Sequence, residues 1–203
     1  MGTTELVQLL GIGAGVGVVG ALVFFARRLS NSLDAIWPNC TTKYGLAFEE
    51  QKTGNPLTAQ RHVRSLTGSV SGVPLRVTSV WELVGRTRRT STTFHARALE
   101  PASARCSIHI TRGGTPGPTF HLVRTGNTAF DRVISLRSDA PDFVRALVTP
   151  PVQAALLQLS VSPVELSYDN GELCLSYGGQ PLRQAELDAP IDVVVALGQA
   201  RPR

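Results

Sequence analysis

The chain has 203 residues, of which 42% are hydrophobic and 17% are charged, and its formal net charge is +5. This length suits one ordinary domain with an appendage and leaves no room for two large catalytic domains with a cleft between them. The apolar fraction excludes a wholly disordered chain. Glycine without a three-residue period and frequent helix breakers exclude collagen and long coiled coils.

Residues 6–26 carry the strongest pattern in the chain, because they hold no charge and only one strongly polar side chain, Gln8. At ~1.5 Å per residue a helix of this length reaches roughly 31 Å, the thickness of a bilayer's hydrocarbon core. A cleaved signal peptide is the main alternative, but the tail MGTTE has no Lys or Arg and no A-x-A site follows. We therefore expect a transmembrane helix over residues 6–26, after a short non-cytoplasmic tail over residues 1–5.

Glycines in this segment permit two interpretations. Gly15, Gly17 and Gly20 spell G-x-G-x-x-G, but the βαβ context that a dinucleotide site needs is missing. Small residues four apart, Gly13, Gly17 and Ala21, instead fit the close-packing stripe through which membrane helices form homo-oligomers. The alternative, that glycine is simply common in membrane helices, stays open.

Charge sets the expected orientation. Arg27 and Arg28 follow the apolar segment and Glu5 precedes it, so the positive-inside rule places the N-terminus outside and the C-terminal part in the cytoplasm, at the cell inner membrane. The three cysteines are odd in number and scattered, as in a reducing compartment, and they lack the C-x-x-C spacing of a zinc site.

Beyond the membrane we expect a juxtamembrane helix and linker over residues 27–65, since residues 52–65 are polar and contain Gly-Asn-Pro. A cytoplasmic α+β domain should follow over residues 66–203. Alternating apolar and polar residues predict strands at 66–70, 73–84, 90–99, 106–111 and 130–137.

The hairpin signal is clearest in VELSYDNGELCLSY. Asn170 and Gly171 suit a two-residue type I′ turn, and antiparallel pairing then places six apolar residues on one face. The expected opposed pairs are Tyr168 with Leu173, Leu166 with Leu175, and Val164 with Tyr177.

Helices are expected towards the C-terminus. Thr149 and Pro150 suit the N-cap and first position of one helix, residues 141–147 form a shorter one, and residues 188–200 form a third, although Val193–Val195 could equally be a strand. The predicted fold class is α+β, with an N-terminal transmembrane helix followed by a mostly antiparallel β-sheet domain of about seven or eight strands with helices towards the C-terminus.

A resemblance runs through most of the part after residue 26. Trp37, Gly45-Leu46, the pattern L-x-G-x-x-x-G-x-P-L-x-V from Leu66 to Val77, and G-x-x-x-F-D from Gly126 to Asp131 are similar to an uncharacterised group of bacterial membrane-anchored proteins of unknown function. These motifs consist mainly of glycines, a proline and apolar residues. The resemblance therefore implies a fold and no catalytic residue.

Candidate chemistry is sparse. His95, His109 and His121 fall on polar faces of predicted strands and could offer zinc three nitrogen ligands, but no nearby carboxylate completes the set, and a solvated face is the plainer interpretation. No nucleophile elbow is present, and Asp131 is the lone carboxylate to examine, with a turn or salt-bridge role favoured. We predict no catalytic, cofactor-binding or metal-binding residue.

Charge divides the chain. Through Gly126 there are 14 Lys/Arg and 6 Asp/Glu, and from Asn127 onward there are 6 and 9. The cluster Arg86, Arg88 and Arg89 is a candidate contact for anionic lipid headgroups or a protein partner, although we favour an Arg-rich solvated sheet. Few aromatics and no recognition motif argue against nucleic acid.

Two functions are compatible with this pattern. The first is a single-pass membrane protein whose cytoplasmic domain binds or scaffolds a partner. The alternative is a membrane-tethered enzyme, hydrolase-like and of unrecognised type. A pocket with perturbed titratable residues would favour the enzyme, whereas a contiguous basic or apolar patch would favour the binding module.

Overall fold

The computed structural model describes residues 35–55, 59–84, 87–111, 121–161 and 163–201. The chain divides into two compact units, Met1–Ile36 and Trp37–Arg203. All contacts reported below lie within the second unit.

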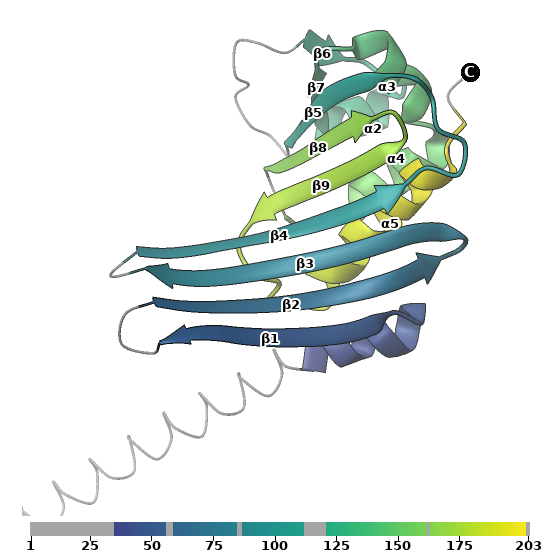
Figure 1. The fold of residues 1–203 in the computed structure, drawn as a ribbon. Helices are drawn as coiled ribbons and strands as arrows, with labels where there is room; N and C mark the ends of the chain where they lie inside the picture. The colour runs from purple at the N-terminus through teal and green to yellow at the C-terminus, as the bar shows by residue number, and fades with distance from the viewer. Residues whose placement is uncertain (1–34, 56–58, 85–86, 112–120, 162, 202–203) are drawn as a thin grey trace, which may run out of the picture. The chain divides into compact units, whose positions relative to one another are not determined.

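One nine-stranded antiparallel sheet organises this unit (Figure 1), in the order β1-β2-β3-β4-β9-β8-β5-β7-β6. The fold is therefore α+β, as predicted. Residues 35–44 are helical and precede the sheet. The strands are β1 Ala47–Asn55, β2 Ala59–Val70, β3 Val73–Val84, β4 Thr87–Arg97, β5 Arg105–Thr111, β6 His121–Val123, β7 Ser135–Ser138, β8 Val164–Asp169 and β9 Glu172–Gly178, and the labelled helices are α2 Thr128–Val133, α3 Pro141–Leu147, α4 Pro150–Gln158 and α5 Ala185–Gln199.

The predicted fold class needs a correction, because it began with a membrane-spanning helix. Among the described residues, no helix combines the length and the apolar character that crossing a bilayer requires. The expected span at residues 6–26, its tail at residues 1–5, and the stripe Gly13, Gly17 and Ala21 lie outside the described residues.

The expected linker is also corrected. Residues 47–55 and 59–70 are β1 and β2, and the whole of β1 pairs with residues 59–67 of β2, so most of the polar segment 52–65 lies in strands. The preceding helix ends at Gly45, whose amide donates to the carbonyl oxygen of Thr41 (2.9 Å) and whose φ is +67°. The sheet accordingly begins about 20 residues earlier than residue 66, where we placed it.

The predicted hairpin is confirmed. Leu166 lies opposite Leu175 and Tyr168 lies opposite Leu173, and Val164 and Tyr177 are buried on the same face. Asn170 and Gly171 both have positive φ, 49° and 92°, as a type I′ turn requires.

Two element types differ from expectation. Residues 130–137 divide into the end of α2 and the strand β7, because the Asn127 side chain accepts a hydrogen bond from the Phe130 amide (3.3 Å) and starts a helix there. The segment with Val193–Val195 is helical, not a strand, and α5 starts at Ala185, three residues before the expected start. Helices α3 and α4 lie where the Pro residues predicted them.

The helices cover one face of the sheet. Helix α5 packs across β3, β4 and β9 with α4 beside it, and Phe143 of α3 contacts the Tyr168 ring on that face, with 5.0 Å between centroids. Gly198 lets α5 approach β3 closely, since a Cβ there would lie 2.7 Å from Val73 Cγ1. This helix-bearing face carries the core.

The helix over residues 35–44 is held to α5 by polar contacts from residue 40 onward. Lys43 Nζ lies 2.8 Å from Asp188 Oδ2, and the Tyr44 hydroxyl donates to Asp192 Oδ1 (3.2 Å). Between them, the fully buried Cys40 accepts a hydrogen bond from the Gln184 amide (3.0 Å). These contacts join residues about 145 apart in the chain, and they hold the helix over residues 35–44 against α5.

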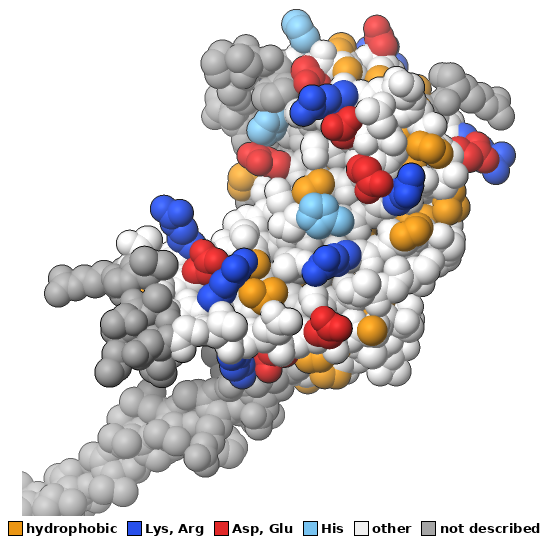
Figure 2. Space-filling model, in the orientation of Figure 1, with side chains coloured by type: hydrophobic (Ala, Val, Ile, Leu, Met, Phe, Trp, Pro, Cys, Tyr) orange, Lys and Arg blue, Asp and Glu red, His pale blue; other side chains and the backbone are white. Residues whose placement is uncertain are grey.

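In the part of the chain that the structure describes, the labelled helices lie behind the sheet (Figure 1), and the opposite face is largely polar (Figure 2). Its middle row consists of hydroxyl side chains in register across β2, β3, β4 and β9, namely Ser65, Thr78, Thr93 and Ser176. We call this the outer face. It is the solvated side that an antiparallel sheet commonly keeps.

Candidate functional site: a groove around Trp81

The helix-bearing face changes character along the strands β1 to β4. Its core row holds Leu66, Val77 and Phe94, in register and fully buried. Two residues further along, the same face carries Glu50, Arg64, Ser79 and Thr92. The next row carries Lys52, His62, Trp81 and Thr90. The apolar core therefore ends, and a polar surface begins, without any change of sheet face.

The cause of this change is the reach of the helix cover. Tyr177, which lies in register with Thr92, donates its hydroxyl hydrogen bond to the Glu186 carbonyl (2.9 Å) in the first turn of α5. Helix α5 runs from this point towards Val73, away from the Trp81 row. Side chains beyond Tyr177 are consequently less covered and mostly polar, with Trp81 and Leu83 as exceptions.

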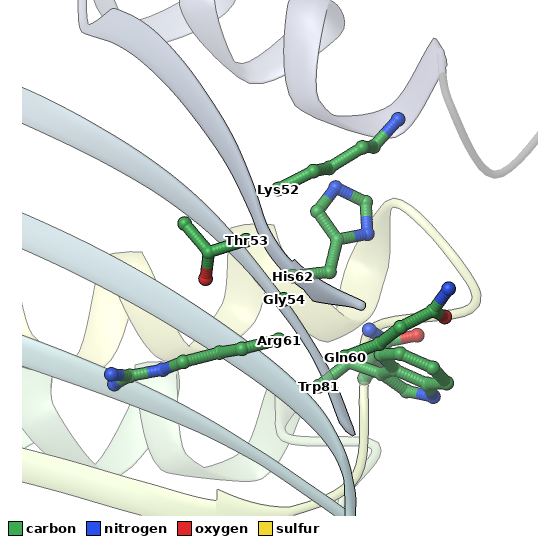
Figure 3. Close-up of a pocket in the computed structure, with 8 residues that line it drawn as sticks. Lys52, Thr53, Gly54, Gln60, Arg61, His62 and Trp81 are labelled. Carbon is green, nitrogen blue, oxygen red and sulfur yellow. The ribbon is translucent and has the colours of Figure 1, made fainter. Parts of the chain in front are cut away.

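Trp81 lies in a pocket of about 430 Å³, which we call the Trp81 groove. Figure 3 shows Lys52, Gln60, His62 and Trp81 on one side of the strands and Thr53 and Arg61 on the other. The lining residues come from β1, β2, β3 and the loop after β9, and they are Lys52, Thr53, Gly54, Gln60, Arg61, His62, Trp81 and Gln180.

A carboxylate with three basic neighbours borders the groove. Glu50 Oε1 lies 2.8 Å from His62 Nε2 and 2.7 Å from Arg64 Nε, and Glu50 Oε2 lies 3.4 Å from Lys52 Nζ. Burial alone would raise the pKa of Glu50, but hydrogen bonds from Arg64 and His62 outweigh it and lower the pKa to about 2. Glu50 is therefore ionised at neutral pH, and the cluster around it keeps a positive balance.

The Glu50 pKa predicts an acid-dependent stability term. A carboxyl whose pKa falls on folding stabilises the fold fully above its unfolded value, here 4.5, and loses that contribution as the pH drops towards 2. Because its side chain is 31% exposed, we expect Glu50→Gln to cost only about 1 kcal/mol at pH 7, well below what the full shift would give. The cost should shrink steadily between pH 4.5 and pH 3 in urea unfolding.

Glu49→Gln is the matched control for this prediction. Glu49 is exposed on the outer face of the same strand, so this variant makes the same change in net charge away from the cluster. A pH-independent cost for Glu50→Gln, or an equal cost for both variants, would contradict the assignment.

The far wall of the groove is fixed by a buried threonine. Thr92 Oγ1 donates to the Gly179 carbonyl (2.8 Å), and the Gly179 amide donates to the Thr90 carbonyl (3.0 Å). These bonds hold the start of the loop that carries Gln180. The side-chain amides of Gln60 and Gln180 line the groove and make no hydrogen bond to other described residues.

The predicted arginine cluster is divided by the sheet. Arg88 lies in register with Leu83 on the helix-bearing face, and its guanidinium carbon is 5.8 Å from the centroid of the Trp81 ring. Arg89 lies in register with Glu82 on the outer face, and Glu82 is paired with Arg61 (3.0 Å). Arg86 lies outside the described residues. Alternation along β4 thus places only Arg88 beside the groove.

Other candidate residues do not converge. Strands β9 and β8 lie between His95 and His109. His121 lies on the helix-bearing face, so the three imidazoles do not meet. Among the described residues, no group of three potential metal ligands occurs. Asp131 accepts hydrogen bonds from the Thr125 amide (3.1 Å) and hydroxyl (2.9 Å), which is a local structural role.

The cysteines are weakly acidic. Burial raises the pKa of Cys40 to about 12 and that of Cys106 to about 11, so both thiols stay protonated at neutral pH.

Sequence reasoning missed the groove because its residues share no local motif. Trp81 has the same parity as the buried Val73 and Val77, which could have placed it on the helix-bearing face. Its partners Lys52 and His62 fall in the segment that we expected to be a linker. Only the pairing of β1 with β2 brings them beside Trp81.

Comparisons with known proteins assign neither a family nor a function to this chain. No protein-family model matches the chain, and no curated protein matches it. Among solved structures, the crystal structure of the mycobacterial trehalose monomycolate transport factor A, TtfA, is similar at a TM-score of 0.45 and 11% identity, over 85% of this chain and 93% of that one. A likeness of this size transfers neither fold nor function to this chain. The resemblance to membrane-anchored bacterial proteins therefore stays a prediction.

Proposed function

We propose that this domain is a binding module and that the Trp81 groove binds an anionic organic ligand. The supporting observation is the row Lys52, His62 and Trp81, which places basic side chains beside an aromatic ring where the helix cover ends. Tryptophan favours burial, so a half-buried ring in a polar groove suits a contact surface.

The chemistry of the lining selects the ligand class. Lys52 supplies positive charge from the lining and Arg88 supplies it from beside the Trp81 ring, while the Gln60 and Gln180 amides and the indole N–H supply further hydrogen bonds. A phosphate or carboxylate would pair with the cations, while the uncharged part of the ligand lies against the indole. Glu50 does not oppose such an anion strongly, because the cations Lys52 and Arg64 and the imidazole of His62 surround it.

This proposal refines the expected partners. An anionic lipid headgroup and a soluble organic phosphate present the same group to the groove. Of the predicted contact residues, Arg88 is the one that it uses, since Arg89 faces away.

Calorimetric titration of the full-length protein tests the proposal. The ligands are inorganic phosphate and short-chain phosphatidylglycerol and phosphatidylcholine, both lipids below their micelle-forming concentration. We expect binding of phosphatidylglycerol and weaker binding of phosphatidylcholine, which has no net charge. Equal heats from inorganic phosphate and phosphatidylglycerol would assign the site to free phosphate, and equal affinity for both lipids would contradict an anion site.

Variants locate the binding. Trp81→Ala should weaken phosphatidylglycerol binding about 30-fold, or about 2 kcal/mol, and Lys52→Ala should weaken it less because Lys52 is well exposed. Arg76→Ala is the matched control, since Arg76 is exposed on the outer face of β3. Equal losses in Arg76→Ala and Trp81→Ala would indicate general electrostatic attraction and overturn the assignment to the groove.

A further inference from the structure

Among the described residues, nothing pairs with the outer edge of the first strand. The order of the sheet places β1 at one edge and β6 at the other, and β6 has only three residues. β1 has nine, contains no proline, and is exposed at every residue from Ala47 to Gly54. An edge of this length presents a row of free backbone donors and acceptors that another strand can pair with.

The residues of β1 are complementary to β1 itself. The strand is centred on Gln51, and antiparallel pairing about this residue brings all nine positions of one copy opposite nine of another. Glu50 then faces Lys52 of the second copy, and Lys52 faces Glu50 of the second copy, so two opposite-charge pairs form. Phe48, which is 37% exposed, faces Gly54 of the second copy, where there is room for a ring.

Neighbouring registers are less favourable. A two-fold axis perpendicular to the sheet keeps helix-bearing faces together, so the centre must fall on a residue. Centring on Glu49, Glu50 or Lys52 places a like-charge pair on the axis itself. Centring on Phe48 or Thr53 shortens the paired segment. Gln51 alone combines full length with charge complementarity.

We propose that two copies of this chain associate through β1, antiparallel and centred on Gln51, so that their sheets continue into one. The partner is a second copy, since the register that pairs the whole strand is also the one that pairs its charges. In each copy, Phe48 then lies opposite Gly54 of the other copy. Because Gly54 lines the Trp81 groove, the ring of Phe48 lies beside the groove of the other copy. The association does not depend on the proposed ligand, because it uses the backbone of β1.

Cysteine cross-linking of the full-length protein tests the register. In a Cys174→Ser background, Gln51→Cys places a thiol directly opposite its own copy, within the distance that a disulfide spans. Glu49→Cys and Thr53→Cys are matched controls on the same strand and the same outer face. Each should stay monomeric alone on a non-reducing gel, whereas an equal mixture of the two should cross-link, since residue 49 faces residue 53.

A second measurement uses charge. Lys52→Glu would set Glu50 opposite a like charge at both ends of the pairing, and we expect the dimer dissociation constant to rise about tenfold in sedimentation equilibrium. A monomeric wild-type chain without Gln51→Cys cross-linking overturns the proposal. Equal cross-linking of all three single variants overturns the register. If the chain cross-links as expected but does not bind phosphatidylglycerol, the result would count against the proposed function alone.

Discussion

Replacing Phe94 with alanine is expected to lower the free energy of unfolding by about 3–5 kcal/mol, because the ring is fully buried at the centre of the sheet. It lies in register with Val77 on one side and Leu175 on the other, and its centroid is 6.0 Å from that of Tyr177. Removing it leaves a cavity under α5 that rigid strands cannot close. In a chain of this length the melting temperature should fall by roughly 10 °C.

His95→Ala is the control for Phe94→Ala. His95 is the next residue of β4, and its side chain is exposed on the outer face. We expect its cost to stay within about 0.5 kcal/mol, since a solvated side chain leaves no cavity. If both variants lost similar stability, β4 would not separate a packed face from a solvated one, and the location of the groove would lose its basis.

The strand faces around Phe94 could be predicted from the sequence, and the reason is local. Phe94 and Ala96 alternate with His95 and Arg97, and the structure buries the first pair and exposes the second. In the hairpin of β8 and β9 the turn residues fix the register independently of the alternation. Two local signals agreed in the hairpin and alternation alone sufficed around Phe94, so no knowledge of distant contacts was needed.

The strands β1 and β2 could not be recognised in the same way. In the groove row Lys52 and His62 are polar on the helix-bearing face, and Thr53 and Arg61 are polar on the outer face. With both faces polar, the two-residue period that marks a half-buried strand disappears. The loss of the strand signal and the presence of the groove therefore have one cause, which is that helix α5 does not reach this end of the sheet.

Helix α5 shows the opposite difficulty. Leu187, Ile191, Val193, Val194 and Val195 are all buried, so the segment is apolar on nearly every side and its period is weak. Contacts with β3, β4, β9 and α4 surround it and decide its state. The Trp81 groove and the free edge of β1 likewise depend on which strands become neighbours, and local patterns do not specify that.

Replacing Gly171 with alanine is expected to cost about 3 kcal/mol, the second large effect on stability. The residue has a φ of +92°, which strains any side-chain-bearing residue by about 1 kcal/mol or more. An added Cβ would also overlap the Cβ of Pro101. Because the Gly171 carbonyl accepts from the Ala98 amide (2.8 Å), the turn is fixed to this loop and cannot move aside freely.

Gly72→Ala separates the two causes. Gly72 occupies the equivalent position of the turn between β2 and β3, with a φ of +84° after Ser71 at 51°, and a Cβ there meets nothing within 4 Å. Gly72→Ala should therefore lower the free energy of unfolding by the backbone strain alone, about 1 kcal/mol. Urea unfolding of both variants measures the difference, which is the cost of pressing the hairpin of β8 and β9 away from Pro101. Equal costs would mean that this loop yields, and that the turn at Gly171 is held by backbone conformation only.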